Sequence, residues 1–180
     1  MICYAISDPS VMNVKDPHPY LKNIAGRADF FLYRDKQNFN YMYDAKAVVE
    51  AARAYPFSKV LLHRDMWLVP TLEADGVHLS GTQRADIPKA KSMGLFVLYS
   101  AHSLEDARDA QKLGADMVTL SPVFESPDKG EALGLDILQS VCRALNIPVI
   151  ALGGVTDEAK IEAVERAGAD GFASIRYFMG

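Results

Sequence analysis

Residues 114–120 read Gly-Ala-Asp-Met-Val-Thr-Leu, and residues 168–174 read Gly-Ala-Asp-Gly-Phe-Ala-Ser. In both stretches a glycine that can end a helix stands just before a run of strand-forming residues. The Ala-Asp pair precedes an apolar run at two more places, Ala28-Asp29 and Ala74-Asp75. The four pairs recur at similar intervals, and each interval has room for two strands and two helices. They therefore mark every second strand of an eight-stranded series.

Short apolar runs alternate with amphipathic stretches along the whole chain. We expect strands near residues 2–6, 30–33, 60–62, 77–79, 96–99, 117–120, 148–152 and 172–175, and the clearest helices at 104–113, 137–145 and 158–167. Strands that alternate with helices predict βαβ units and a parallel sheet. The regular repeat favours a closed (β/α)8 TIM barrel over an open doubly wound sheet. Residues 1–180 are expected to form a single domain.

The composition is that of an ordinary globular chain, with 180 residues, 49% hydrophobic and 23% charged residues, and a net charge of −4. This acidic balance gives no global basic field, so we expect no nucleic-acid partner. The N-terminal stretch lacks the basic region of a signal peptide, and no apolar run reaches the ~20 residues of a membrane helix. Cys3 and Cys142 lie far apart and form no CxxC motif, which suits a reducing cytoplasm.

Polar residues follow almost every expected strand, at the end where TIM barrels carry their active sites. Arg34 and Lys36 follow the second strand and share one face, because side chains alternate along a strand. Two cations at the mouth suit an anionic substrate, although a solvated charged loop would have the same sequence. His63 follows the third strand and is a further candidate for substrate binding. It has no metal-ligand spacing with His78, so we expect no transition-metal site.

The segment Ser100-Ala101-His102-Ser103 follows the fifth strand and places Ser100 and His102 on one face. A histidine in this position can transfer protons near neutral pH, and the alternative is a structural histidine held by hydrogen bonds. Ser103 is a candidate cap for the next helix, since Asp106 stands three residues later.

Gly153-Gly154 ends the seventh strand, and Arg176 follows the eighth. The loops after these two strands are the usual phosphate site of TIM barrels, where glycines let backbone N–H groups approach the anion. Arg176 is a plausible phosphate partner, and the alternative for the glycines is a plain turn. The polar loop 121–130 contains two prolines and is a further candidate for function, as opposed to an ordinary surface loop.

The order of these motifs resembles the thiamine phosphate synthase/TenI family of small TIM barrels. The resemblance covers nearly the whole chain and rests on five stretches in the family's order and spacing. They are Ala-Asp-Gly-Val-His-Leu (74–79), Ser-Ala-His-Ser-Leu-Glu-Asp-Ala (100–107), Gly-Ala-Asp (114–116), Ser-Pro-Val-Phe-Glu-Ser-Pro-Asp-Lys (121–129) and Ile-Pro-Val-Ile-Ala-Leu-Gly-Gly-Val (147–155).

The resemblance implies two possible activities. The synthase joins a pyrimidine diphosphate to a thiazole phosphate and holds Mg²⁺ with two aspartates, one after the third strand and one after the fourth. Here those places read His63-Arg64 and Ser80-Gly81-Thr82-Gln83. Arg34 and Lys36 match the family's pyrimidine diphosphate residues, and Ser126 and Lys129 fall in its loop after the sixth strand. In that loop Asp128 replaces a hydroxyl residue.

TenI-type proteins lack the metal pair and aromatise a thiazole carboxylate phosphate by moving a proton. The resemblance to this branch predicts a cytoplasmic, metal-independent tautomerase that binds a thiazole phosphate. In this reading His102 is the general acid/base, Arg34 and Lys36 hold the carboxylate, and Gly153, Gly154 and Arg176 hold the phosphate. The alternatives are a synthase with an atypical Mg²⁺ site and a non-catalytic binder or regulator.

The expected first strand starts beside Met1, and the chain stops directly after the expected eighth strand. We therefore expect a short barrel without an additional N-terminal helix and without an eighth helix. The outer face of the eighth strand would then be partly bare around Phe172, Tyr177, Phe178 and Met179. A second copy of the chain is expected to cover it, which predicts a homo-oligomer. The lost helix dipole would also raise the importance of Arg176 for phosphate binding.

Overall fold

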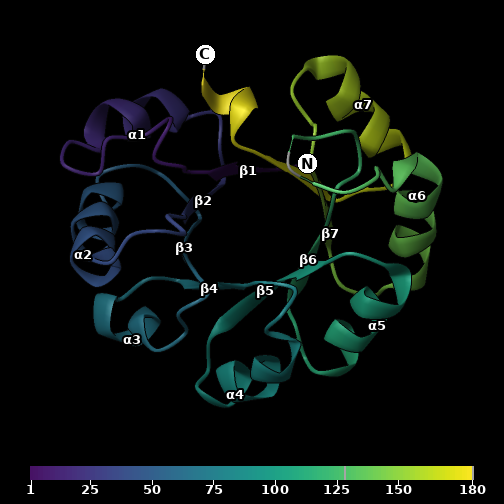
Figure 1. Ribbon diagram of the computed structural model, residues 1–180, viewed down its shortest axis with the longest axis horizontal. Coiled ribbons are helices and arrows are strands. Elements are labelled where there is room, and N and C mark those ends of the chain that lie inside the picture. Colours follow the sequence, from purple (N-terminus) through teal and green to yellow (C-terminus); the bar gives the residue numbers. More distant parts are fainter. Residues whose placement is uncertain (128, 180) are drawn as a thin grey trace.

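The computed structural model describes residues 1–127 and 129–179 as a closed barrel of eight parallel strands in sequential order (Figure 1). Asp128, one of the residues singled out above, lies outside the described residues. The strands are β1 (Ile2–Ile6), β2 (Phe30–Tyr33), β3 (Lys59–His63), β4 (Gly76–Leu79), β5 (Phe96–Ala101), β6 (Met117–Leu120), β7 (Val149–Leu152) and β8 (Gly171–Ser174). The predicted TIM barrel is confirmed.

Helices form a ring outside the strands (Figure 1). The described residues contain seven α-helices and two short 3₁₀ helices, which are α1 (His18–Ile24), α2 (Tyr41–Ala52), α3 (Leu68–Leu72), η1 (Arg84–Asp86), α4 (Ile87–Ser92), α5 (Leu104–Lys112), α6 (Gly134–Ala144), α7 (Glu158–Arg166) and η2 (Arg176–Met179). Ser103 caps α5 as expected, because its Oγ accepts the Asp106 N–H at 3.1 Å. Each helix in these residues is too short or too polar to cross a lipid bilayer.

The repeated Ala-Asp motif has a single structural role. The Asp29 N–H donates to the carbonyl oxygen of Cys3, and Asp29 Oδ2 accepts the N–H of Cys3, both at 2.8 Å. The same reciprocal pair of bonds recurs between Asp75 and Val60, Asp116 and Val97, and Asp170 and Val149. Each aspartate thus joins the start of an odd-numbered strand to the even-numbered strand that follows, so the sequence repeat reflects fourfold structural repetition.

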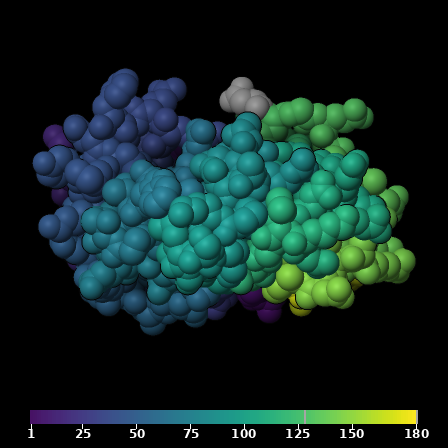
Figure 2. Space-filling model, turned by 90° about the horizontal axis from the view of Figure 1, so that it is seen from below, coloured from purple at the N-terminus to yellow at the C-terminus, as the bar shows by residue number. Residues whose placement is uncertain are grey.

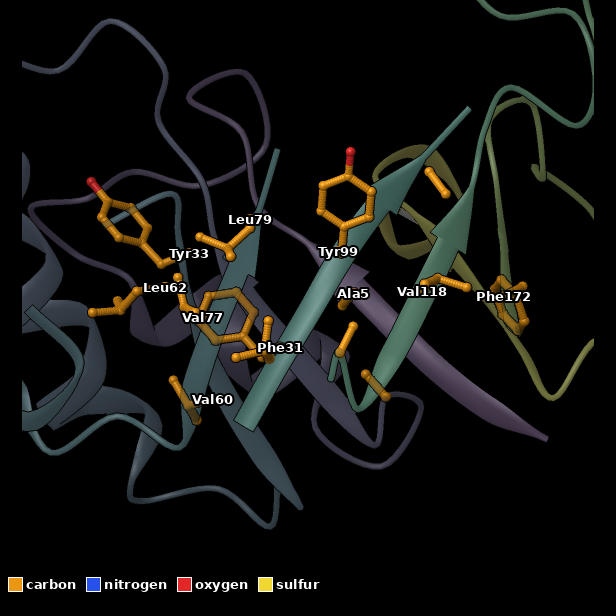
Figure 3. Close-up of a cluster of buried hydrophobic side chains, with 14 of the residues drawn as sticks. Ala5, Phe31, Tyr33, Val60, Leu62, Val77, Leu79, Tyr99, Val118 and Phe172 are labelled. Atoms are coloured by element: carbon orange, nitrogen blue, oxygen red, sulfur yellow. The ribbon is translucent and has the colours of Figure 1, made fainter. Parts of the chain in front are cut away.

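Two apolar layers hold the barrel together. Side chains on the outer strand faces pack beneath the helices, among them Phe31, Leu62, Val77 and Val118 (Figure 3). The inward-facing side chains fill the barrel interior, so it is a packed core and not a pore. This inner layer contains Tyr4, Ile6, Phe30, Leu32, Leu61, Leu98, Met117, Ile150 and Ala173.

The expectation of a partly bare outer face on β8 is wrong for Phe172 and Phe178, whereas Met179 is exposed. The Phe178 ring stacks on Phe172 with the centroids 6.0 Å apart, and both side chains are buried. The turn η2 folds back between α1 and α7 (Figure 1). It is held there by hydrogen bonds from Arg27 Nη2 and Asn23 Nδ2 of the α1 region to the carbonyl oxygens of the turn. The aromatic turn therefore occupies the place expected for a partner subunit. A homo-oligomer stays a prediction, but a bare β8 face no longer supports it.

Candidate active site

A cavity of about 440 Å³ opens at the carboxyl ends of the strands. In side view this is the upper edge of the barrel, where the segments leading into α2 and α6 stand highest (Figure 2). Seven of the ten site residues proposed from the sequence line the cavity, together with Asp8 and others. The seven are Arg34, Lys36, Ser126, Lys129, Gly153, Gly154 and Arg176. Ser100, His63 and His102 are not among its lining residues.

Arg34 lies at the end of β2 and pairs with Asp8, which follows β1. Its Nη1 lies 3.1 Å from Asp8 Oδ2, and its backbone N–H donates to Ser7 Oγ. Burial would raise the pKa of Asp8, but hydrogen bonds from Ser10 and the charge of Arg34 outweigh it, so the net pKa is lowered. Asp8 is therefore ionised and orients the guanidinium at the cavity wall. Sequence reasoning did not assign it a role.

The cations of the cavity repel one another. The pKa of Lys36 is lowered mainly by the charge of Arg34 and next by burial. Burial lowers the pKa of Lys129, and the charges of Arg34 and Lys36 lower it further. Among the described residues that line the cavity, Asp8 is the sole carboxylate. A positive site with one compensating acid favours an anionic ligand, and a phosphate or diphosphate would relieve the repulsion.

Gly153 and Gly154 join the cavity wall to the loop between β6 and α6. The Phe124 N–H donates to the carbonyl oxygen of Gly153 at 3.0 Å. A Cβ on Gly154 would lie 2.6 Å from the Glu125 carbonyl oxygen, and its φ of +71° also disfavours a side chain. The glycines thus serve close packing of this loop as well as forming part of the cavity.

A second hollow of about 720 Å³ adjoins the first on the side of α7. Ser126, Lys129, Thr156 and Arg176 line both hollows, and the second is lined in addition by Lys160, Glu125 and Glu131. Lys160 Nζ donates to Thr156 Oγ1 at 3.0 Å. Sequence reasoning missed both residues, because Lys160 lies within the solvent-facing pattern of α7.

His102 follows β5 on another side of the mouth. Its Nδ1 lies 2.8 Å from the Ser121 carbonyl oxygen, so Nδ1 carries a proton in this bond and the neutral ring keeps its lone pair on Nε2. The ring lies against Gly81, where a Cβ would be 2.9 Å from Nε2. The Tyr99 hydroxyl donates to the Gly81 carbonyl oxygen at 2.9 Å and so holds the loop that follows β4. His102 is exposed, and its geometry suits proton transfer outside the cationic cavity.

His63 ends β3 and is half-buried. Burial lowers its pKa to about 3, and the charges of Arg34, Lys36 and Arg64 act in the same direction. His63 is therefore neutral and adds no charge to an anion site. Its backbone N–H donates to the Tyr41 hydroxyl at 3.0 Å, which holds the end of β3 against α2.

Beneath the mouth, a chain of hydrogen bonds crosses the barrel interior. The Tyr4 hydroxyl lies 2.9 Å from His78 Nδ1, and His78 Nε2 lies 2.8 Å from Ser100 Oγ. Beside it, Thr119 Oγ1 is buried and has no hydrogen-bond partner among the residues that the structure describes. The sequence position of His78 gave no sign of its connection to Tyr4.

The residues at the expected Mg²⁺ position do not fit that ion. Mg²⁺ requires oxygen ligands in near-octahedral geometry, usually with carboxylates. Here Arg64 adds a positive charge after β3, and its carbonyl oxygen accepts a bond from Gln83 Nε2 at 3.0 Å. Within residues 1–127 and 129–179, no three His, Cys, Asp or Glu side chains gather as metal ligands.

Comparison with known proteins identifies the lineage. The sequence profile of the family described as thiamine monophosphate synthase matches residues 3–178. The chain belongs to the thiamine monophosphate synthase family. A putative thiamine-phosphate synthase 2 of Aquifex aeolicus is 36% identical over 149 residues, covering 81% of this chain and 77% of that protein. The thiamine-phosphate synthase of Caldivirga maquilingensis is 33% identical over 180 residues, covering 96% and 85%.

A solved structure agrees with this membership. The thiamine phosphate pyrophosphorylase of Pyrococcus furiosus superposes with a TM-score of 0.83 at 27% identity, covering 97% of this chain and 85% of that one. The protein is thus a short TIM barrel of a family of thiamine biosynthesis. Its relatives bear the name of the synthase, whereas the missing aspartate pair after β3 and β4 pointed to the TenI branch.

Proposed function

We propose that the protein joins a pyrimidine diphosphate to a thiazole phosphate and releases diphosphate. The observation that carries this proposal is the cavity in which Arg34, Lys36 and Lys129 meet Gly153, Gly154 and Arg176. Both substrates carry phosphate, and one cavity with two groups of anion partners suits a reaction between them. The names of the relatives support the same activity.

The chemical demand of this reaction is charge stabilisation. The bond between the pyrimidine's methylene carbon and the diphosphate breaks, the diphosphate leaves with the electron pair, and the thiazole nitrogen forms the new bond to that carbon. Fixed cations that face the leaving group stabilise its developing negative charge. Arg34, Lys36 and Lys129 are the groups of this chain that supply it, and Asp8 keeps the Arg34 guanidinium in place.

The direct test incubates the purified protein with both substrates and measures thiamine phosphate and released diphosphate. Each substrate alone is the control. We expect product only with both substrates, in EDTA as well as with Mg²⁺, and a rate lowered by Arg34→Ala. Absence of product under both metal conditions would refute the proposal.

A thiazole tautomerase is the second candidate, and His102 favours it. Because Nδ1 donates to the Ser121 carbonyl oxygen, Nε2 is the ring nitrogen of His102 that can exchange a proton with a substrate, and proton transfer without metal needs no aspartate pair. In this candidate function Arg34 and Lys36 hold the substrate's carboxylate. The test follows aromatisation of the thiazole tautomer by ultraviolet absorbance, with wild type beside His102→Ala. Equal rates for the two would exclude His102 as the proton-transfer group.

If neither reaction occurs, the remaining alternative is a non-catalytic binder of phosphate ligands. It predicts phosphate-ligand affinity that His102→Ala leaves unchanged, since His102 does not line the cationic cavity.

A further inference from the structure

Three side chains from strands distant in the sequence form a polar chain within the apolar barrel interior. Tyr4 from β1 contacts His78 from β4, which contacts Ser100 from β5, at 2.9 and 2.8 Å. Tyr4 is 0% exposed and His78 is 3% exposed, and the phenol ring packs edge-on against Phe30. Ser100 is half-buried and lies nearer the mouth. A buried chain of this kind needs a definite arrangement of its protons.

The number of protons follows from burial. Burial lowers the pKa of His78 well below its usual range, and the neighbouring His63, Arg34 and Lys129 also oppose a second proton. The His63 ring meets it edge-on at 6.4 Å between centroids. Burial holds the pKa of Tyr4 well above its usual range. The hydrogen-bonded series of three side chains therefore contains the neutral phenol of Tyr4, the neutral imidazole of His78 with one N–H, and the Ser100 hydroxyl.

The direction of the bonds follows from the surroundings of Tyr4. If His78 carried its proton on Nδ1, the Tyr4 oxygen would accept that bond and its own O–H would point into apolar neighbours. A buried donor without an acceptor is costly, and the described residues offer Tyr4 no second acceptor. With the opposite order, Tyr4 donates to Nδ1, Nε2–H donates to Ser100 Oγ, and every buried proton of the chain is paired.

We infer that Tyr4 and His78 are positioning residues, which occupy a lone pair of Ser100 Oγ and leave its O–H free to donate to a ligand. Ser100 pairs in register with Thr119 of β6, whose buried hydroxyl has no hydrogen-bond partner among the described residues. Thr119 is 0% exposed, so the half-buried Ser100 is the hydroxyl of the two that a ligand can reach. The ligand atom that the Ser100 hydroxyl suits is a hydrogen-bond acceptor, either a phosphate oxygen or an unprotonated ring nitrogen. That Ser100 meets a substrate rests on the proposed function, whereas the proton order does not.

This order also fixes what Ser100 does not do. A serine becomes a nucleophile when a histidine nitrogen accepts its proton. Here Nε2 already carries a proton and donates it to Ser100, so His78 is not a general base for that hydroxyl. Ser100 acts as a donor that stabilises negative charge. The Ser–His contact therefore does not indicate a hydrolase.

The first experiment reads the tautomer of His78 without any substrate. Long-range ¹H–¹⁵N correlation spectra of the labelled protein separate Nδ1–H from Nε2–H rings, and the spectrum of His78→Gln assigns the signal. We expect a neutral Nε2–H ring across the neutral pH range in wild type, and loss of this fixed state in Tyr4→Phe. Tyr20→Phe is the matched control, because it removes another buried hydroxyl while leaving the chain intact. A Nδ1–H ring in wild type, or an unchanged ring in Tyr4→Phe, would overturn the inference.

The second experiment uses the synthase assay. Tyr4→Phe keeps the ring packing and is expected to lower kcat roughly tenfold with little change in KM, because the lost donor acts on developing charge. Tyr20→Phe is expected to keep the wild-type kcat. If Tyr4→Phe keeps the wild-type kcat in an active enzyme, the hydrogen bonds of Tyr4 and His78 do not position Ser100. If the wild type makes no thiamine phosphate, the proposed function fails, and the tautomer measurement still decides the proton order.

Discussion

The imidazole Nδ1 of His102 lies 2.8 Å from the carbonyl oxygen of Ser121, which joins the end of β5 to the loop that follows β6. The backbone N–H of His102 donates to Asp106 Oδ2 at 3.1 Å. The ring is thus oriented by the loop that follows β6, and its backbone is held by α5, although the residue is exposed. An exposed histidine with a fixed tautomer is suited to proton transfer, whereas the cationic cavity beside it is suited to anion binding.

Gly81→Ala tests how closely this ring must approach its neighbour. The new Cβ would lie 2.8 Å from His102 Cδ2, so the ring must move and the bond to Ser121 weakens. We expect the fixed Nδ1–H tautomer of His102 to disappear from the ¹H–¹⁵N spectrum, while phosphate affinity stays within about twofold. Gly130→Ala is the matched control, because its Cβ meets no atom within 4 Å. An unchanged His102 signal in Gly81→Ala would contradict this view of the site.

Arg34→Ala tests the anion site. Arg34 is charged, directed by Asp8 and part of the cavity wall, so its loss removes a charge-assisted bond to the ligand and leaves Asp8 facing it. We expect the affinity for inorganic diphosphate to fall about ten- to hundredfold, measured by calorimetry in EDTA. Lys22→Ala on α1 is the control for a loss of surface charge. The described residues offer no carboxylate cluster for a metal, so the wild type should bind diphosphate in EDTA. A wild type that binds diphosphate only with Mg²⁺ would contradict this prediction.

The lowered pKa of His63 predicts that the free energy of unfolding depends on pH. Its folded pKa of about 3 lies below the usual value of 6.5, so the unfolded chain binds the extra proton as the pH falls below 6.5. The free energy of unfolding therefore decreases between pH 6.5 and about 3, by about 1.4 kcal/mol per pH unit for this group.

His63→Gln should flatten the curve of urea stability against pH in that window. Tyr41→Phe removes the hydroxyl that accepts the His63 N–H but leaves the titrating ring in place. It should lower the free energy of unfolding at every pH and keep the slope. Equal slopes for wild type and His63→Gln would show that this histidine is not held neutral.

Asp75→Ala tests the repeated motif at the start of the even-numbered strands. The Val60 N–H loses its acceptor at 2.6 Å, while the backbone bond from Asp75 to Val60 remains. We expect a loss of about 1–3 kcal/mol in the free energy of unfolding, the usual cost of a buried donor without a partner. Asp16→Ala, which removes an exposed carboxylate from the β1–α1 loop, should change it by less than about 0.5 kcal/mol. Equal effects of the two substitutions would rule out a special role for the motif.

The barrel was predictable because its signals are local and periodic. Glycine ends a helix, and apolar residues begin a strand. The bounds of β1, β2 and β6 agree with the expected runs, whereas β5 extends to Ala101 because Ser100 and Ala101 pair with β6. The Ala-Asp repeat was visible, but the bonds that explain it join residues of neighbouring strands. The polar residues after the strands were also predictable as one site, since parallel strands place all their carboxyl ends at the same end of the barrel.

The sequence did not predict how the residues at the carboxyl ends of the strands divide into separate sites, because this depends on side-chain directions across the barrel. The fold brings Arg34 to Asp8 and Lys129, but keeps His102 on another side of the mouth. It connects Tyr4 to His78 across the interior, where no periodic pattern relates the two positions. It also places Phe178 on Phe172, which covers the face expected to be bare. Sequence patterns describe neighbours along the chain, whereas these contacts arise from closure of the sheet.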